Sequence, residues 1–114
     1  MDILTATRAL GALAQPSRLR AFRLLIEAGI DGMPAGAIAA RIGIPHNTMS
    51  THLGTLENAG LLTSERQGRS IIYRADITSL KSLLAYLIED CCHGRPEQCA
   101  VMLDDLLSPH RETA

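Results

Sequence analysis

The stretch "GIPHNTMSTHLGTLENAGLL", residues 43–62, constrains the fold of this chain more than any other part of it. A Gly-Ile-Pro turn opens the stretch, and a helix is expected from there until Gly60 stops it. Met49, Leu53 and Leu56 recur at i, i+4 and i+7, the spacing of a helix face that packs inward. The opposite face carries small, hydrogen-bonding side chains. Such a face suits the DNA major groove because it allows close approach and offers donors and acceptors to base edges and phosphates.

Three further helices are expected before this stretch. Residues from about 3 to 14 are rich in Ala and Leu, and "QPSRLR" then puts Pro16 in the first turn of a second helix, which Gly29 closes. A loop over residues 31–34 leads to a short third helix that ends at Gly43. Apolar residues are available to one face of each helix: Ile3, Leu10 and Leu13 in the first, Leu19, Phe22, Leu25 and Ile26 as a buried stripe in the second, and Ile38 and Ile42 in the third.

The third helix and the helix that follows it are joined by a short turn that contains glycine. Residues 34–59 are therefore expected to form a helix-turn-helix whose second helix reads DNA. An ordinary amphipathic helical hairpin with a solvated polar face has the same pattern. That alternative stays open on this stretch alone.

Residues 60–75 are expected to form a β-hairpin. Two β-prone segments, residues 61–65 and 70–74, flank the turn-like "RQGR". Arg66 and Arg69 would lie near the tip, and a basic hairpin directly after a helix-turn-helix is the winged helix arrangement, in which the wing touches phosphates or the minor groove. A solvated hairpin tip is the alternative for either arginine.

The charge of the chain is unevenly distributed, although its net value is only −1 over 114 residues. Residues 1–75 carry eight Arg against five Asp and Glu, whereas residues 76–114 carry three basic residues against seven acidic ones. A nucleic-acid surface is therefore expected in the first two thirds of the chain. Only three aromatic residues are present, so stacking on single-stranded bases is poorly supported and duplex DNA is the expected partner.

The chain resembles the ArsR/SmtB family of bacterial metal-sensing winged helix repressors over roughly residues 8–92. The resemblance rests on "LGALAQPSRLRAFRLL" and on "MSTHLGTLENAGLLTSERQGRSIIYR". It implies a mainly α fold with a β-hairpin wing (α+β), and a homodimer that binds double-stranded operator DNA and releases it when a metal or metalloid binds. The residues that match the family pattern in order are Ser50, His52, Leu53, Leu56, Ala59, Gly60, Leu61, Gly68 and Tyr73.

Candidate DNA contacts come from the outward face of the reading helix and from the tip of the hairpin. His52 has two readings, a base or phosphate contact or helix packing, because it lies between the inward stripe and the outward face. It is not expected to bind metal, since a lone imidazole lacks the partners that a site requires. The candidate DNA-binding residues are His46, Asn47, Thr48, Ser50, Thr51, His52, Thr55, Arg66 and Arg69.

All 114 residues are expected to form a single winged helix-turn-helix domain. A fifth helix is predicted from about residue 78 to residue 90, within a dimerisation segment over 76–92, and a cysteine segment with a last helix follows over 90–107. The fifth helix carries a near-unbroken stripe of leucines, more than a domain of this size buries alone. Part of that stripe is expected to bury in a partner, and the family resemblance implies that the first and last helices form the dimer interface.

All three cysteines lie within ten positions, in "DCCHGRPEQC", residues 90–99. An odd number of thiols in a reducing compartment argues against a structural disulfide and points to a metal, a metalloid or redox chemistry. Cys91 by itself could extend the apolar face of the fifth helix. Core packing does not explain the Gly/Pro turn after Cys92, which can bring Cys99 back to the pair.

Three thiolates with no obligatory fourth ligand fit a thiophilic ion that forms three pyramidal bonds, such as trivalent arsenic or antimony. A zinc site usually takes four ligands, and His93 or Asp90 would have to complete it. The segment is similar to the C-terminal three-cysteine site of a subgroup of arsenic-responsive ArsR repressors. That resemblance implies that Cys91, Cys92 and Cys99 bind As(III), with Sb(III) or methylated As(III) as possible substitutes. Other sites of the family are absent, since "GMPAGAIAARIG" has no cysteine and "LKSLLAYLIED" has no His or suitably spaced acidic set.

The sequence therefore predicts a cytoplasmic repressor that releases its operator when As(III) or Sb(III) binds the three cysteines. A repressor of the same fold that responds to thiol oxidation or to another thiophilic metal is the alternative. An enzyme is not expected, because the sequence has no phosphate-binding loop, no Cys-x-x-Cys beside a βαβ pattern and no nucleophile–base pair. Neither an organic cofactor nor a membrane is expected, since no apolar run approaches the roughly 18–20 residues that a bilayer requires.

Overall fold

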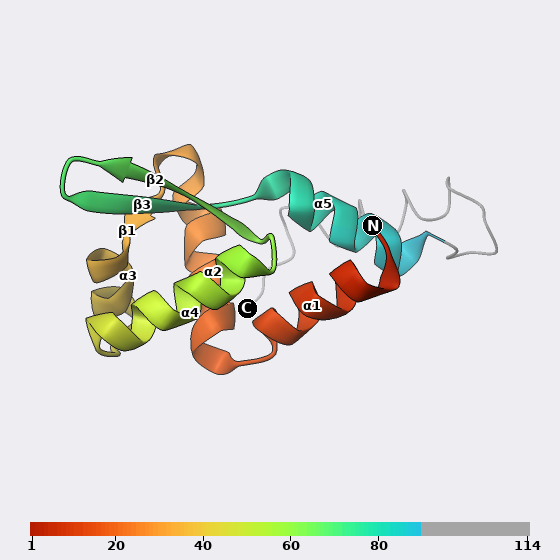
Figure 1. The fold of residues 1–114 in the computed structure, drawn as a ribbon, viewed down its shortest axis with the longest axis horizontal. Helices are drawn as coiled ribbons and strands as arrows, with labels where there is room; N and C mark the ends of the chain where they lie inside the picture. Colours follow the sequence, from red (N-terminus) through yellow and green to blue (C-terminus); the bar gives the residue numbers. More distant parts are fainter. Residues whose placement is uncertain (90–114) are drawn as a thin grey trace, which may run out of the picture.

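The computed structural model describes residues 1–89, which form a helical body with a small three-stranded antiparallel sheet (Figure 1). This is a winged helix-turn-helix, as the sequence predicts. The elements in chain order are α1 (Ile3–Leu13), α2 (Pro16–Ala28), the short 3-10 turn η1 (Gly29–Asp31), β1 (Met33–Pro34), α3 (Ala35–Ile42), α4 (His46–Asn58), β2 (Leu62–Gln67), β3 (Ser70–Ala75) and α5 (Ile77–Ile88).

Side chains cap the first turns of three helices. The Asp2 carboxylate accepts a hydrogen bond from the Thr5 N–H at 2.8 Å, and this bond holds the pKa of Asp2 below its usual range. Gln15 accepts in the same way from the N–H three residues later at 2.8 Å, and Pro16 follows at the first helical position. Asp76 caps α5 through the Ser79 N–H at 3.1 Å. Each cap satisfies a backbone donor that a helix start leaves without an intrahelical partner.

The core forms around α4. Met49, Leu53 and Leu56 are fully buried, which confirms the inward stripe predicted for this helix. They belong to one cluster with Leu25 of α2 and Ile38 of α3. Burying one such side chain contributes about 1.5–3 kcal/mol, so this stripe decides which face of α4 remains in solvent.

The first two helices differ from the expected faces. In α1 the alanines Ala6, Ala9 and Ala12 pack against the core, whereas Ile3 is 64% exposed and faces solvent. The small alanine side chains allow α1 to pack closely against the rest of the fold. Residues on the opposite face of α1, such as Ile3, then point to solvent. In α2 the prediction that Leu19 is buried is wrong, because it is 43% exposed while Ala21, Phe22 and Leu25 pack inward.

The sheet has the strand order β1-β3-β2. The predicted hairpin is confirmed, with Gln67 paired to Ser70 across a two-residue turn in which Gly68 has φ +63°. β2 begins one residue after its predicted start and ends two residues after its predicted end, and β3 ends one residue later than predicted. The two-residue strand β1 was not predicted, and it pairs Met33 with Tyr73 on the free edge of β3. This pairing fastens the wing to the start of the helix-turn-helix.

The elements are divided between two ends of the molecule. Figure 1 shows the start of α4 and the tip of the β2–β3 hairpin at one end, and α1 beside α5 at the other. Within residues 1–89 no helix has the length and hydrophobicity needed to cross a bilayer.

Substituting Gly32 tests the attachment of the wing. A Cβ at Gly32 would lie 2.5 Å from the Tyr73 carbonyl oxygen, and the residue has φ +65°. Gly32→Ala is therefore expected to destabilise the fold by about 2–3 kcal/mol through backbone strain and steric overlap. Urea unfolding measures this change. Gly54→Ala is the control, because nothing lies within 4 Å of its added Cβ, and the helix should gain up to about 1 kcal/mol. Equal stability of the two variants would contradict the close contact between Gly32 and the wing.

Candidate nucleic-acid interface

The helix-turn-helix turn is closed by backbone hydrogen bonds. Gly43 adopts the left-handed conformation with φ +86°, and the N–H groups of Gly43 and Ile44 both donate to the Ala39 carbonyl, at 2.8 and 3.2 Å. Pro45 then precedes α4 and provides no side-chain cap to it. The first turn of α4 is thus held by the rigid turn before it, and its exposed side chains are presented in a fixed orientation.

The outward face of α4 is polar and mostly exposed. His46, Asn47 and Ser50 line one open recess at the start of the helix. Further along, the hydroxyl groups of Thr51 and Thr55 donate to the backbone carbonyls four residues earlier, both at 3.2 Å. The hydroxyl protons of both threonines are therefore engaged within the helix. The Asn47 Oδ1 atom accepts from the Thr48 N–H at 2.9 Å, which leaves the Asn47 amide N–H groups available to an external partner. Thr48 is exposed as predicted, while Thr55 is half-buried.

His52 lies against α2 and not on the exposed face. It is half-buried, and its Nδ1 atom is 3.4 Å from Nη1 of Arg18. The Arg18 Nε–H group also donates to the Ala12 carbonyl at 2.6 Å, at the end of α1. This arrangement supports the helix-packing reading of His52, and a DNA contact by its other ring nitrogen stays a prediction. Arg18 thereby joins the end of α1 to the middle of α4.

Three polar contacts hold the base of the wing. The Arg74 guanidinium forms an ion pair with Glu65 at 2.8 Å, and its Nε–H donates to the Ile30 carbonyl at 2.6 Å. The Ser64 hydroxyl donates to the Glu57 carboxylate at 2.7 Å, which links β2 to the end of α4. These contacts fix the hairpin relative to α4.

Tyr73 lies on the inner part of the same hairpin. It is partly buried and packs against the core cluster. Burial raises the pKa of its hydroxyl, and the nearby Glu57 carboxylate raises it further. The hydroxyl therefore stays neutral and adds no charge to the wing.

Arg66 and Arg69 are exposed at the hairpin tip, as predicted. Arg69 is in the turn itself, and Arg66 pairs across the ladder with Ile71. Among the described residues, neither side chain has a recorded ion pair. Both are thus available to an anionic partner.

Sequence reasoning missed Arg18 and Arg74, which position the site without being exposed on it. Their partners lie 34 and 44 residues away in the chain. The spacing of residues within one segment does not predict a contact between residues so far apart in the chain.

The three predicted thiol ligands, Cys91, Cys92 and Cys99, lie outside the described residues. Within residues 1–89 no group of three or more His, Cys, Asp or Glu side chains is placed to hold a metal ion. A metal or metalloid site therefore has no support from the part of the chain that the structure describes, and it stays a prediction from the cysteine segment.

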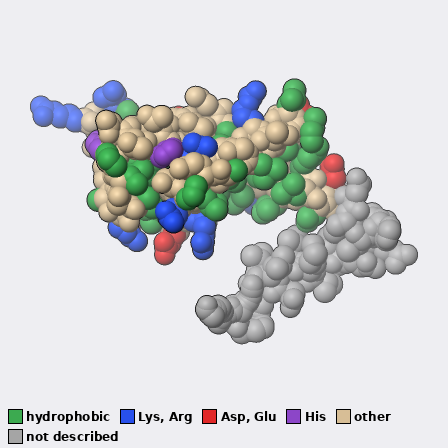
Figure 2. All heavy atoms as spheres, turned by 90° about the horizontal axis from the view of Figure 1, so that it is seen from below, with side chains coloured by type: hydrophobic (Ala, Val, Ile, Leu, Met, Phe, Trp, Pro, Cys, Tyr) green, Lys and Arg blue, Asp and Glu red, His purple; other side chains and the backbone are tan. Residues whose placement is uncertain are grey.

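Exposed apolar side chains gather on α1 and α5. Ile3 and Leu4 are 64% and 73% exposed, and Leu84 and Leu87 are 48% and 52% exposed. Figure 2 shows hydrophobic side chains concentrated toward the end of the molecule where α1 lies, with basic side chains projecting at the opposite end. A protein that leaves this much apolar surface on two neighbouring helices commonly buries it in an interface.

The chain is similar to known regulators of transcription. Residues 13–65 match the family described as a helix-turn-helix domain. The HTH-type transcriptional regulator NmtR of Mycobacterium tuberculosis is 37% identical over 75 residues, which cover 66% of this chain and 60% of that protein.

Two solved structures share the fold. One is the homodimeric winged helix-turn-helix DNA-binding domain Mb0332 from Mycobacterium bovis, described as a possible ArsR-family regulator; it is 23% identical, with a TM-score of 0.62, over 96% of this chain and 88% of that one. The other is described as a possible transcriptional regulator for arsenical resistance; it is 28% identical, with a TM-score of 0.62, over 91% and 97% of the two chains. The chain therefore has the winged helix-turn-helix fold, and it is similar to proteins described as HTH-type transcriptional regulators.

Proposed function

We propose that this protein is a homodimeric repressor that binds double-stranded operator DNA and releases it when trivalent arsenic or antimony binds Cys91, Cys92 and Cys99. The observation that carries the DNA-binding part is the exposed polar face of α4 beside a basic hairpin tip, at the same end of the molecule. In this arrangement α4 enters the major groove and the wing contacts the flanking backbone.

The side chains of α4 and those of the wing contribute to DNA binding in different ways. Asn47 offers an amide that pairs with base edges, and His46 and Ser50 beside it offer donors and acceptors. Arg66 and Arg69 neutralise phosphates and contribute affinity without sequence preference. Because Ser64 of the wing is hydrogen-bonded to Glu57 of α4, the wing and α4 bind DNA together as one rigid unit.

Arg69→Ala and Asn47→Ala separate these two contributions. Arg69→Ala should weaken binding to all sequences alike and lower the slope of log K against log salt by about 0.9, the loss of one phosphate contact. Asn47→Ala should leave the slope unchanged and cost about 1–3 kcal/mol of discrimination between operator and random duplex. Fluorescence anisotropy with DNA from upstream of the gene measures both quantities. Lys81→Ala on α5 is the control for the removal of one positive charge. If it lowers the slope of log K against log salt as much as Arg69→Ala does, the proposed phosphate contact of Arg69 is wrong.

The dimer that we propose is formed by α1 and α5. The supporting observations are the exposed apolar side chains on these two helices and the homodimeric state named for the Mb0332 domain. To read a palindromic operator, such a dimer would have to hold its two α4 helices about 34 Å apart, one turn of DNA.

Leu87→Glu tests the dimer interface. A carboxylate placed in an apolar contact should weaken association by about 2 kcal/mol, roughly thirtyfold in dissociation constant. Sedimentation velocity over a concentration series measures the change. Ile30→Glu is the matched control, because Ile30 is 89% exposed on η1, which is part of neither proposed interface helix. A Leu87→Glu variant that dimerises as tightly as Ile30→Glu would overturn the proposed interface.

The inducer site is proposed from the sequence of the cysteine segment. Three thiols within residues 91–99 match the three bonds of As(III), and one similar structure is described as a possible regulator for arsenical resistance. Cys91 follows the end of α5 by three residues, so a ligand that draws the three sulfurs together acts directly on the proposed dimer helix.

A change at the dimer interface has a physical route to the reading helix. α1 packs beside α5, and the Arg18 guanidinium bonds the last turn of α1 on one side and approaches His52 of α4 on the other. A movement of α1 relative to α2 would therefore change the position of α4. The coupling must be reciprocal, so operator DNA weakens inducer binding by the same factor.

Arsenite should lower the affinity of the reduced protein for its operator by roughly 5–150-fold, the usual range of allosteric coupling. Cys99→Ser should abolish this response and leave the affinity without arsenite unchanged. The same anisotropy assay, run with As(III), Sb(III), Zn(II), Cd(II) and peroxide, measures the response. A release by peroxide under conditions where As(III) has no effect would replace the metalloid proposal with thiol oxidation.

A further inference from the structure

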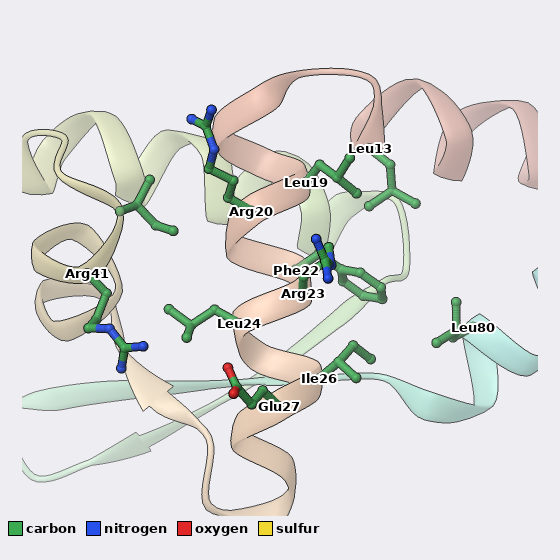
Figure 3. Close-up of a pocket in the computed structure, with 11 residues that line it drawn as sticks. Leu13, Leu19, Arg20, Phe22, Arg23, Leu24, Ile26, Glu27, Arg41 and Leu80 are labelled. Atoms are coloured by element: carbon green, nitrogen blue, oxygen red, sulfur yellow. The ribbon is translucent and has the colours of Figure 1, made fainter. Parts of the chain in front are cut away.

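A groove of about 800 Å³ runs along α2, and no residue of α4 lines it (Figure 3). Its floor is apolar and includes Leu19, Leu24 and Ile26 of α2. Ile42 of α3 also lines the groove. Figure 3 shows Leu80 of α5 on the side opposite Arg41 of α3. None of the proposed DNA contacts lines this groove, and neither do Leu84 and Leu87, the exposed leucines of α5 that we assign to the dimer. The groove borders the proposed dimer helices through Leu13 of α1 and Leu80 of α5.

The rim of the groove is basic. Arg20 and Arg23 of α2 and Arg41 of α3 line it, with Glu27 as the only acidic side chain among the described lining residues. Figure 3 shows Arg20 and Arg41 at the edges of the apolar floor. Such a surface is complementary to an amphipathic helix with an apolar stripe and acidic flanks.

Residues 99–107 of the same chain have that pattern in their sequence. Their apolar positions recur at i, i+3, i+4, i+7 and i+8, the spacing that places residues on one helix face. At 100° per residue, Asp104 and Asp105 fall on opposite flanks of this stripe. Val101 falls on the far side of the helix and outside the stripe. The members of the stripe are Cys99, Met102, Leu103, Leu106 and Leu107.

The length of chain after α5 allows this segment to reach the groove. Leu80 lines the groove from the first turns of α5, and Ile88 at its end is about 12 Å further along the helix axis, at 1.5 Å per residue. Cys99 is ten positions after Glu89, and an extended chain of that length spans about 33 Å. The "HGRP" turn lies within this connection and favours a reversal of direction.

We propose that residues 99–107 dock as a helix in the α2 groove of their own protomer, with Asp104 and Asp105 facing the arginines of the rim. Docking places Cys99 at the surface of α2, the helix whose Arg18 approaches the reading helix. The cysteine segment is then held between α5 and α2. This docking holds whether or not the cysteines bind arsenic, so its failure would leave the proposed function standing.

Methyl NMR of the full-length protein tests the docking. In Leu106→Asp, the methyl signals of Leu24, Ile42 and Leu80 should shift, because the apolar stripe leaves the groove. The same signals should stay in place in Val101→Asp, which adds the same charge outside the stripe. The methyl signals of Leu53 in the core report whether the fold is intact, and Leu106→Ala serves as a milder variant if Leu106→Asp fails to fold.

Two results would overturn the docking. One is groove signals that respond equally to Leu106→Asp and Val101→Asp. The other is groove signals that respond to neither substitution; if these signals then shift with protein concentration, a second copy of the chain covers the groove.

Discussion

The burial of one apolar face of α4 is the constraint on which the rest of the structure depends. Met49, Leu53 and Leu56 are fully buried among residues of α2 and α3, so α4 cannot rotate about its axis without exposing them. The opposite face is thereby fixed in solvent, with His46, Asn47 and Ser50 around one recess. The orientation of the surface that we assign to DNA is a consequence of core packing.

The wing and α1 are attached to this helix by polar contacts. Ser64 bonds Glu57 at the end of α4, and Arg74 ties β3 to the backbone of η1, so the hairpin moves with the body. On the other side Arg18 connects the Ala12 carbonyl with His52. The DNA-facing elements and the proposed dimer helix therefore share one network, which gives a signal at α5 and α1 a physical path to α4.

Local patterns account for the parts that sequence reasoning predicted correctly. The period of α4, the capping residues and the "RQGR" turn each act within a few residues, and so α4 and the hairpin were predicted with nearly correct bounds. Features set by distant partners were not predicted. The strand Met33–Pro34 exists only because β3 offers a free edge, and Leu19 of α2 is exposed because the helix packs inward through Phe22 and Leu25 instead. The contacts of Arg18 and Arg74 span 34 and 44 residues. The cysteine site lies beyond the described residues, so its support comes from the sequence.

Mapping the DNA contacts on the protein tests the central claim most directly. Backbone amide NMR signals of the reduced protein would be followed while its operator duplex is added. The account predicts that the largest shifts fall on residues 46–55 of α4 and 66–69 of the wing, with smaller shifts in α2. Shifts centred on α2, with α4 unaffected, would contradict it.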